Sequence, residues 1–164
     1  MILPERYWKV RSSLGFDQIE FGVGGLFLFT VTEIEAGQIG YSVHQDASSL
    51  CSDKEGAWQQ TWIVIGQDTA CGDPLIIDIA DPALPVFRDF HGQGRWDPVC
   101  IAISLDAFVS SLREFAQIAR GRSTPVDRDA KPVTAAERRD FLLRISEIND
   151  GRANMDFWEV LLEA

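Results

Sequence analysis

Short apolar runs separated by turn residues occupy most of the first two thirds of the chain. Six runs share this character, at residues 19–21, 26–31, 62–65, 75–79, 86–90 and 99–103. The runs from residue 62 onward are rich in Val, Ile and Phe and are bounded by Gly, Pro or Asp, which is typical of β-strands. Because the connections between them are too short for crossover helices, neighbouring strands are predicted to be antiparallel.

Apolar residues recur at helical spacing in four further segments. The predicted helices are residues 4–14, 105–116, 134–149 and 154–162. Ser104 and Asn154 are suitable N-caps, and Thr134 with Glu137 matches a capping box. The pattern predicts an α+β fold, with a single antiparallel β-sheet of about five or six strands and helices packed on it. Residues 1–120 are expected to form the sheet-containing domain, and residues 121–164 a C-terminal helical extension packed on the same domain.

The connecting segments carry local signals of their own. Residues 22–25 contain three glycines and are predicted to form the turn between the first two strands. Thr32 and Glu35 match a capping box, which predicts a short helix that ends near Gln38. Residues 44–56 are predicted to be a long, mobile loop, and residues 121–131 a polar connector between helices.

Length and composition restrict the class of protein. The chain has 164 residues, of which 46% are hydrophobic and 24% charged, an ordinary balance for one globular domain. No apolar stretch approaches the roughly 20 residues that a membrane span needs, and the first residues do not resemble a signal peptide. Three widely spaced cysteines fit neither a disulfide framework nor a zinc motif. The expectation is a cytoplasmic protein with free thiols and no membrane contact.

The net charge of −10 favours some partners over others. Seven acidic residues face only two basic ones between Ile65 and Ser110. Such a surface repels nucleic acid and attracts basic partners. The alternative interpretation is that the charge only keeps the molecules apart in solution.

Three elements of the chain together resemble the SUKH superfamily of bacterial immunity proteins and fungal cell-wall regulators. They are the apolar strand that ends in Ile65-Gly66, the run Gly72-Asp73-Pro74-Leu75-Ile76-Ile77-Asp78, and Val86 to Trp96 followed by Val99 to Phe108. The resemblance covers residues 62–115, and residues 3–43 more weakly. It implies an immunity protein that binds and neutralises a cognate toxin, often a nuclease. The fungal relatives imply an alternative, a regulatory scaffold that binds cellular proteins.

Five residues are candidates for partner binding: Asp68, Asp73, Asp89, Trp96 and Asp97. The carboxylates belong to the acidic stretch, and exposed Trp is enriched at interface hot spots. Each has a structural alternative. Asp73-Pro74 is a turn dipeptide, so the Asp73 side chain is predicted to hold the turn before Pro74. Trp96 fits a core position equally well.

A small hydrolase is the third hypothesis, because crowded carboxylates near His91 provide candidate acids and bases. The residue spacing matches no metal site, and Cys71 has no evident base close by in the sequence. His44 stands alone in a polar segment. The sequence therefore predicts no enzyme, no cofactor and no metal.

Overall fold

One antiparallel sheet is the central element of the structure. The computed structural model describes residues 3–163. The strands in this range are β1 (Gln18–Phe21), β2 (Gly24–Leu28), β3 (Trp62–Asp68), β4 (Pro74–Asp78), β5 (Val86–Arg88) and β6 (Val99–Ala102). They pair in chain order and the sheet curls into a half-barrel. The predicted α+β class with an antiparallel sheet is confirmed, with six strands in the described range.

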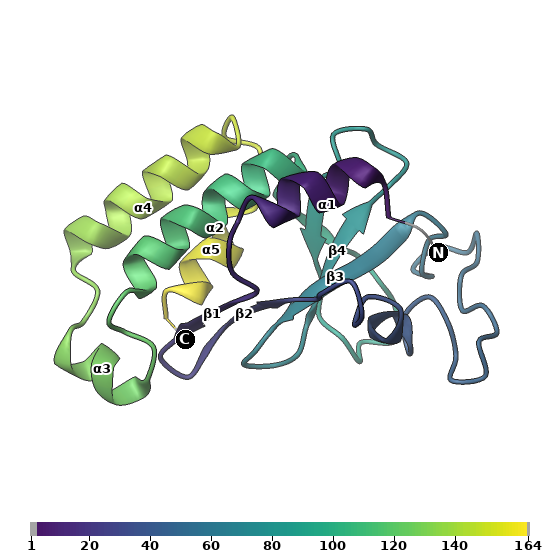
Figure 1. The fold of residues 1–164 in the computed structure, drawn as a ribbon, viewed down its shortest axis with the longest axis horizontal. Helices are drawn as coiled ribbons and strands as arrows, with labels where there is room; N and C mark the ends of the chain where they lie inside the picture. The colour runs from purple at the N-terminus through teal and green to yellow at the C-terminus, as the bar shows by residue number, and fades with distance from the viewer. Residues whose placement is uncertain (1–2, 164) are drawn as a thin grey trace.

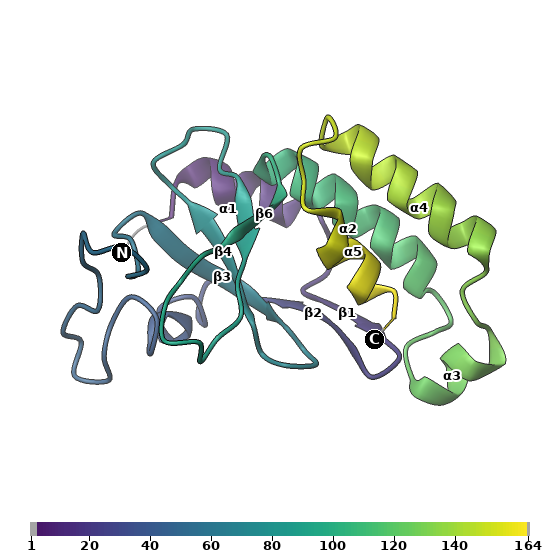
Figure 2. The same ribbon diagram turned by 180° about the vertical axis from the view of Figure 1, so that it is seen from behind.

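The helices gather mainly on one side of this sheet (Figure 1). They are α1 (Glu5–Ser12), α2 (Leu105–Ala119), α3 (Pro125–Ala130), α4 (Ala135–Ile148) and α5 (Met155–Leu161), and a short 3-10 helix, η1 (Ala36–Gln38), lies apart from them. Helix α2 contacts β1 and β6, and α1 and α4 pack against α2. Helix α5 lies between α4 and β6 (Figure 2).

Strand alternation explains the main core. Every second residue of β3 and β4 points towards the helices, including Ile63, Ile65, Leu75 and Ile77, each 1% exposed or less. Apolar side chains of the last two helices enter the same core. They are Phe141, Ile145, Trp158 and Leu161, with Leu162 directly after α5.

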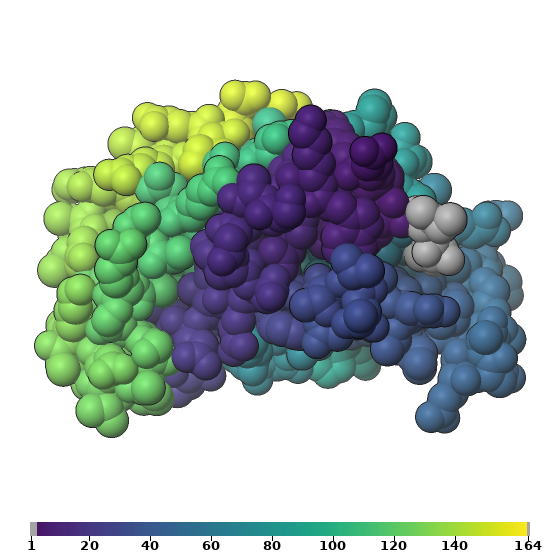
Figure 3. Space-filling view, viewed as in Figure 1, coloured from purple at the N-terminus to yellow at the C-terminus, as the bar shows by residue number. Residues whose placement is uncertain are grey.

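The opposite face of the sheet holds a second, smaller core. Trp58, Val64 and Ile76 are buried there, and half-buried aromatic side chains pack around them. The segment of residues 29–61 builds much of this cover, and Figure 3 shows part of it in blue at the end of the molecule opposite to α3. The amide group of Gln38 docks the segment, because it donates to the Val64 carbonyl (2.8 Å) and accepts from the Val64 N–H (3.0 Å).

The first hairpin and the segment after it differ from the sequence expectation. The hairpin turn consists of Gly22 and Val23 alone, whereas Gly24 and Gly25 belong to β2 and pair with β1. The capping box predicted at Thr32 and Glu35 is wrong. Glu33 accepts instead from the N–H and the hydroxyl of Thr30 (2.9 and 2.7 Å), because β2 ends at Leu28 and frees this earlier N–H.

Two of the predicted connectors have different outcomes. Residues 44–56 contain no helix or strand, as predicted. Isolated bridges such as Val43 with Ser49, and local hydrogen bonds such as those from Ser48 to Asp46, order this part of the chain. Residues 121–131, predicted as a plain connector, contain the helix α3. Pro125 at its first turn and a capping box of Thr124 with Asp127 explain why it forms.

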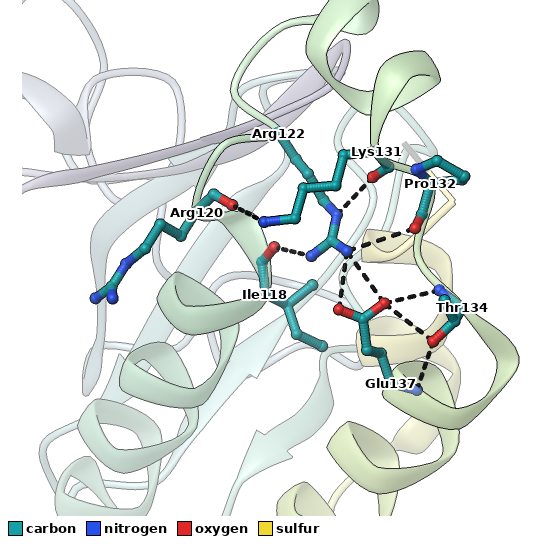
Figure 4. A network of polar contacts seen from close by, with 7 residues as sticks. All are labelled: Ile118, Arg120, Arg122, Lys131, Pro132, Thr134 and Glu137. Carbon is teal, nitrogen blue, oxygen red and sulfur yellow. Dashed lines mark hydrogen bonds and ion pairs between the residues drawn. The ribbon is translucent and has the colours of Figure 1, made fainter.

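Arg122 joins the end of α2 to the start of α4 (Figure 4). Its side chain is 3% exposed and donates to the carbonyls of Ile118 and Lys131, at 2.7 Å each. It also pairs with the Glu137 carboxylate at 2.8 Å. Glu137 in turn accepts from the Thr134 N–H at 2.9 Å, which completes the predicted capping box. A buried guanidinium with this many acceptors is well satisfied, so the network ties the start of α4 to the end of α2.

This network predicts a pH-dependent contribution to stability. The Thr134 N–H, followed by the Arg122 hydrogen bond, lowers the pKa of Glu137 from 4.5 to about 2. A lowered carboxyl pKa stabilises the fold above pH 4.5, and this contribution is lost as the pH falls towards 2. Glu137→Gln is therefore expected to lower the melting temperature at pH 7, and the difference from wild type should shrink steadily below pH 4.5.

Thermal unfolding at several pH values between 7 and 3 measures this difference. Glu147→Gln is the matched control, because it removes one charge from an exposed position of the same helix. A difference between wild type and Glu137→Gln that stays constant with pH would show that the charge of Glu137 contributes nothing.

The thiols and the helices agree with the expectations drawn from composition. Cys51, Cys71 and Cys100 are free cysteines, and Cys71 is exposed. Within residues 3–163, no helix has the length and apolar character needed to cross a membrane.

Candidate functional site

Two of the predicted site residues meet below the surface, where β3 and β5 end and β4 begins. Arg88, the last residue of β5, donates to Asp73 at 2.6 Å and lies 3.9 Å from Asp68. The side chains of Arg88, Asp68 and Asp73 are only 16%, 10% and 3% exposed. The expectation that Asp68 and Asp73 lie on an exposed acidic surface is therefore corrected, because a buried guanidinium already holds both carboxylates.

Asp73 organises the chain that follows β5. One of its oxygens accepts from Arg88, and the other accepts from the His91 N–H (2.9 Å) and lies 2.7 Å from His91 Nδ1. A single carboxylate thus fixes residues three positions apart. The prediction that Asp73 holds the turn before Pro74 is wrong, because its oxygens are engaged with β5 and the segment after it.

Asp68 holds that turn instead. Its Oδ1 accepts from the N–H groups of Cys71 (2.6 Å) and Gly72 (3.3 Å), so it closes the connection from β3 to β4. This is ordinary Asx-turn chemistry. The sequence could not separate the two aspartates, since both precede or flank the same turn and only the sheet register decides which side chain faces Arg88.

Phe90 packs on this buried network and is exposed at the surface. The Arg88 guanidinium carbon lies 3.7 Å from the centroid of the Phe90 ring. The ring is nevertheless on the surface, since Phe90 is 52% exposed. Stacking on a guanidinium that is itself held by Asp73 favours this position of the ring. An exposed aromatic side chain that is ordered in advance is favourable for binding, because it loses little entropy on association.

The other two predicted aspartates lie beside Phe90, near or on the surface. Asp89 accepts from the N–H groups of Phe90 (2.7 Å) and Asp97 (2.6 Å), which closes the loop between β5 and β6. The side chain of Asp97 is 85% exposed and lies 3.8 Å from that of Arg95, which is 72% exposed. Both charges of this pair are therefore open to solvent.

Trp96 is half-buried and belongs mainly to the second core. Its ring contacts Trp58 (centroids 5.0 Å apart) and Tyr41 (5.6 Å). The backbone N–H of Trp96 donates to the Gly56 carbonyl at 2.8 Å, which ties the loop to the cover of the opposite face. Burial, together with the negative charges of Asp73 and Asp68, raises the pKa of Tyr41. The sequence is compatible with Trp96 either as an interface residue or as a core residue, and these contacts favour the core position.

Two cavities flank the loop between β5 and β6. The larger, of about 360 Å³, lies between α5 and the strand ends, and the smaller, of about 210 Å³, lies on the side of Asp89 and Asp97. Arg88, Phe90 and Val99 line both, so these residues form the wall between them. The two cavities and this wall are called the Phe90 surface below.

The Phe90 surface includes residues that the sequence did not single out. Val99 (41% exposed) and Val160 (61% exposed) are apolar side chains on the outside of the molecule. Asp156 lies in the first turn of α5 and is also exposed. The available signal was the position of Val160 on the outer side of its amphipathic helix, but only the tertiary structure places this residue beside Phe90.

The remaining candidates are not brought together with these residues in a recognisable catalytic arrangement. His44 is exposed in the segment of residues 29–61, and Cys71 lies at the mouth of the larger cavity. Among residues 3–163, no three His, Cys, Asp or Glu side chains are grouped closely enough to hold a metal ion. The Asp73 carboxylate and the His91 ring are close enough to resemble an acid–base pair. The same carboxylate oxygen also accepts from the His91 backbone N–H, so its evident role is to position the chain after β5.

Comparisons with protein families, with curated proteins and with solved structures find no match for this chain.

Proposed function

We propose that this chain is a cytoplasmic immunity protein that binds and neutralises a cognate protein toxin. It acts by covering a basic surface of the toxin and performs no chemistry of its own. The motifs between residues 62 and 115 that resemble the SUKH superfamily supply the class of partner. The observation that carries the proposal is the Phe90 surface, where an exposed aromatic side chain stacked on a paired guanidinium lies among exposed carboxylates.

The charges of this surface favour a basic partner. Asp97 and Asp156 are exposed, and within residues 3–163 Asp156 has no ion-pair partner. The whole chain carries a net charge of −10, which adds a long-range attraction for any positively charged protein. A nuclease surface that holds a phosphate backbone is basic by necessity. An acidic inhibitor can therefore occupy the site that the nucleic acid would use.

The interior network supports the same proposal. Asp68, Arg88 and Asp73 keep their charges buried and paired, so they contribute to shape rather than to contact. An inhibitor benefits from such support, because binding then requires no ordering of the loop that makes the contact. Asp68 and Asp73 are accordingly proposed as supporting residues, and Asp89, Asp97 and Phe90 as the contact region. Trp96 supports that region from the second core.

The proposal predicts protection and electrostatically steered association. Co-expression with the cognate toxin should restore growth of cells that the toxin alone kills. For a catalytically inactive form of that toxin, the variant Asp97→Asn/Asp156→Asn should associate about threefold to tenfold more slowly at low salt. The effect should fade at high salt, because ions screen exposed charges. Stopped-flow mixing at two salt concentrations measures both rates.

The matched control is Asp129→Asn/Asp140→Asn, which changes the net charge equally on α3 and α4. It should slow association much less than the first variant. Equal rates for the two double variants would contradict the placement of the contact region. Absence of protection would reject the immunity function and leave a regulatory scaffold as the remaining interpretation.

A further inference from the structure

The larger cavity of the Phe90 surface has an apolar wall. Its volume is about 360 Å³, and it opens between α5 and the ends of the strands. The apolar side chains around it are Phe90, Val99, Phe157, Val160 and Leu161. Leu161 is buried, whereas Phe90 and Val160 are more than half exposed. The apolar character therefore begins inside the cavity and continues over its edge.

Charged groups surround this apolar region on two sides. Asp156 lies at the edge on α5, and Asp97 lies beyond the wall that Phe90 and Val99 form. The one cation of the cavity, Arg88, is paired with Asp73 and covered by the Phe90 ring. The smaller cavity adds one further cation, Arg95, which lies 3.8 Å from Asp97. Carboxylates still outnumber cations around the apolar centre, and an apolar centre with a polar rim is the arrangement of a protein-binding hot spot.

We propose that this cavity receives one apolar side chain of a protein partner, and that Lys or Arg residues flanking that side chain lie against Asp97 and Asp156. The inference rests on the proposed function for the source of the partner, a basic toxin, and adds the chemistry of the anchor. Phe90 and Val160 both line the cavity and are more than half exposed, so in this proposal they contact the inserted side chain.

Two other occupants fit the observations less well. A small apolar molecule would fill the cavity but would leave the exposed parts of Phe90, Val99 and Val160 in water. A second copy of this chain would place two identical acidic rims against each other, and the two chains, each with a net charge of −10, would repel one another. A protein with a basic surface covers the outer apolar area and neutralises the rim at the same time.

The test uses the full chain and a library of random displayed peptides. Peptides selected on the wild type should carry an apolar residue next to Lys or Arg. They should bind Phe90→Ala about 30-fold more weakly, the factor that corresponds to a hot-spot residue. Val160→Ala should also weaken binding of these peptides. Leu143→Ala is the matched control, because Leu143 is 56% exposed on α4 and lines neither cavity, and it should leave binding unchanged.

The results that overturn the proposal are distinct. Peptides without basic residues, equal binding to wild type and Phe90→Ala, or no enrichment at all would each reject it. So would a wild-type dimer that Phe90→Ala dissociates, or a small apolar molecule that copurifies with wild type and not with Phe90→Ala. Failure of the immunity function is read separately, from toxin co-expression. Protection that persists in the variant Phe90→Ala/Val160→Ala would reject the anchor and leave the immunity function standing.

Discussion

A chain that ends at Arg120 is expected to lose its cooperative unfolding transition and to aggregate. Such a chain lacks Phe141, Ile145, Trp158 and Leu161, all 6% exposed or less in the intact protein. Each buried side chain of this kind contributes about 1.5–3 kcal/mol, whereas the whole stability of a domain is only about 5–15 kcal/mol. The truncation would also expose the faces of α2 and β6 that α4 and α5 cover.

A single substitution tests the same point with less disturbance. Trp158 is fully buried, and its indole N–H donates to the Ile101 carbonyl on β6 at 2.9 Å. Trp158→Ala should therefore cost about 3–5 kcal/mol of unfolding free energy, while Leu143→Ala on the outer face of α4 should stay within about 0.5 kcal/mol. Denaturant unfolding gives both values. A shortened chain that remains monomeric with an unchanged melting temperature would make the last helices a separate appendage.

Asp73→Ala is expected to destabilise the protein by about 3–5 kcal/mol, because it leaves a buried guanidinium without its main acceptor. Arg88 would retain only Asp68, 3.9 Å away. The N–H of His91 would lose its acceptor as well. The loop between β5 and β6 should loosen in consequence, and the Phe90 ring should lose its fixed position.

The double variant Asp73→Ala/Arg88→Met separates the cost of an unpaired charge from the loss of packing. It should be more stable than Asp73→Ala alone, because no buried charge is then left unpaired. Asp97→Ala is the control for removing an exposed aspartate of the same loop, with an expected change within about 0.5 kcal/mol. If Asp73→Ala unfolds at the same denaturant concentration as Asp97→Ala, the network has no structural role.

The buried network gives the acidic stretch of this chain two different functions. Asp68 and Asp73 are enclosed with Arg88 and maintain the loop geometry, whereas Asp97 is exposed beside Arg95 and, in the proposed function, contributes to the attraction of a partner. Counting charges along the sequence treats these residues alike. Mutations at the two kinds of site should therefore have different consequences, with stability affected by Asp73 and association affected by Asp97.

The sequence alone determined the elements of the fold. Six apolar runs became the strands of the described sheet, since side-chain alternation and short turns leave an antiparallel meander as the natural pairing. Ser104, Thr134 and Asn154 cap the helices they were predicted to begin, because capping depends on residues within one turn. The missed helix α3 carried the same kind of signal in Thr124 and Asp127.

The candidate site was decided by the tertiary structure. Whether an aspartate is buried depends on the register of β4 against β5, which pairs Leu75 with Arg88 and places that guanidinium beside Asp73. The apolar part of the surface depends on α5, which brings Val160 next to Phe90 although 69 residues separate them in the sequence. Local patterns specify helices, strands and caps through contacts within a few residues, whereas exposure and proximity arise only when distant elements pack together.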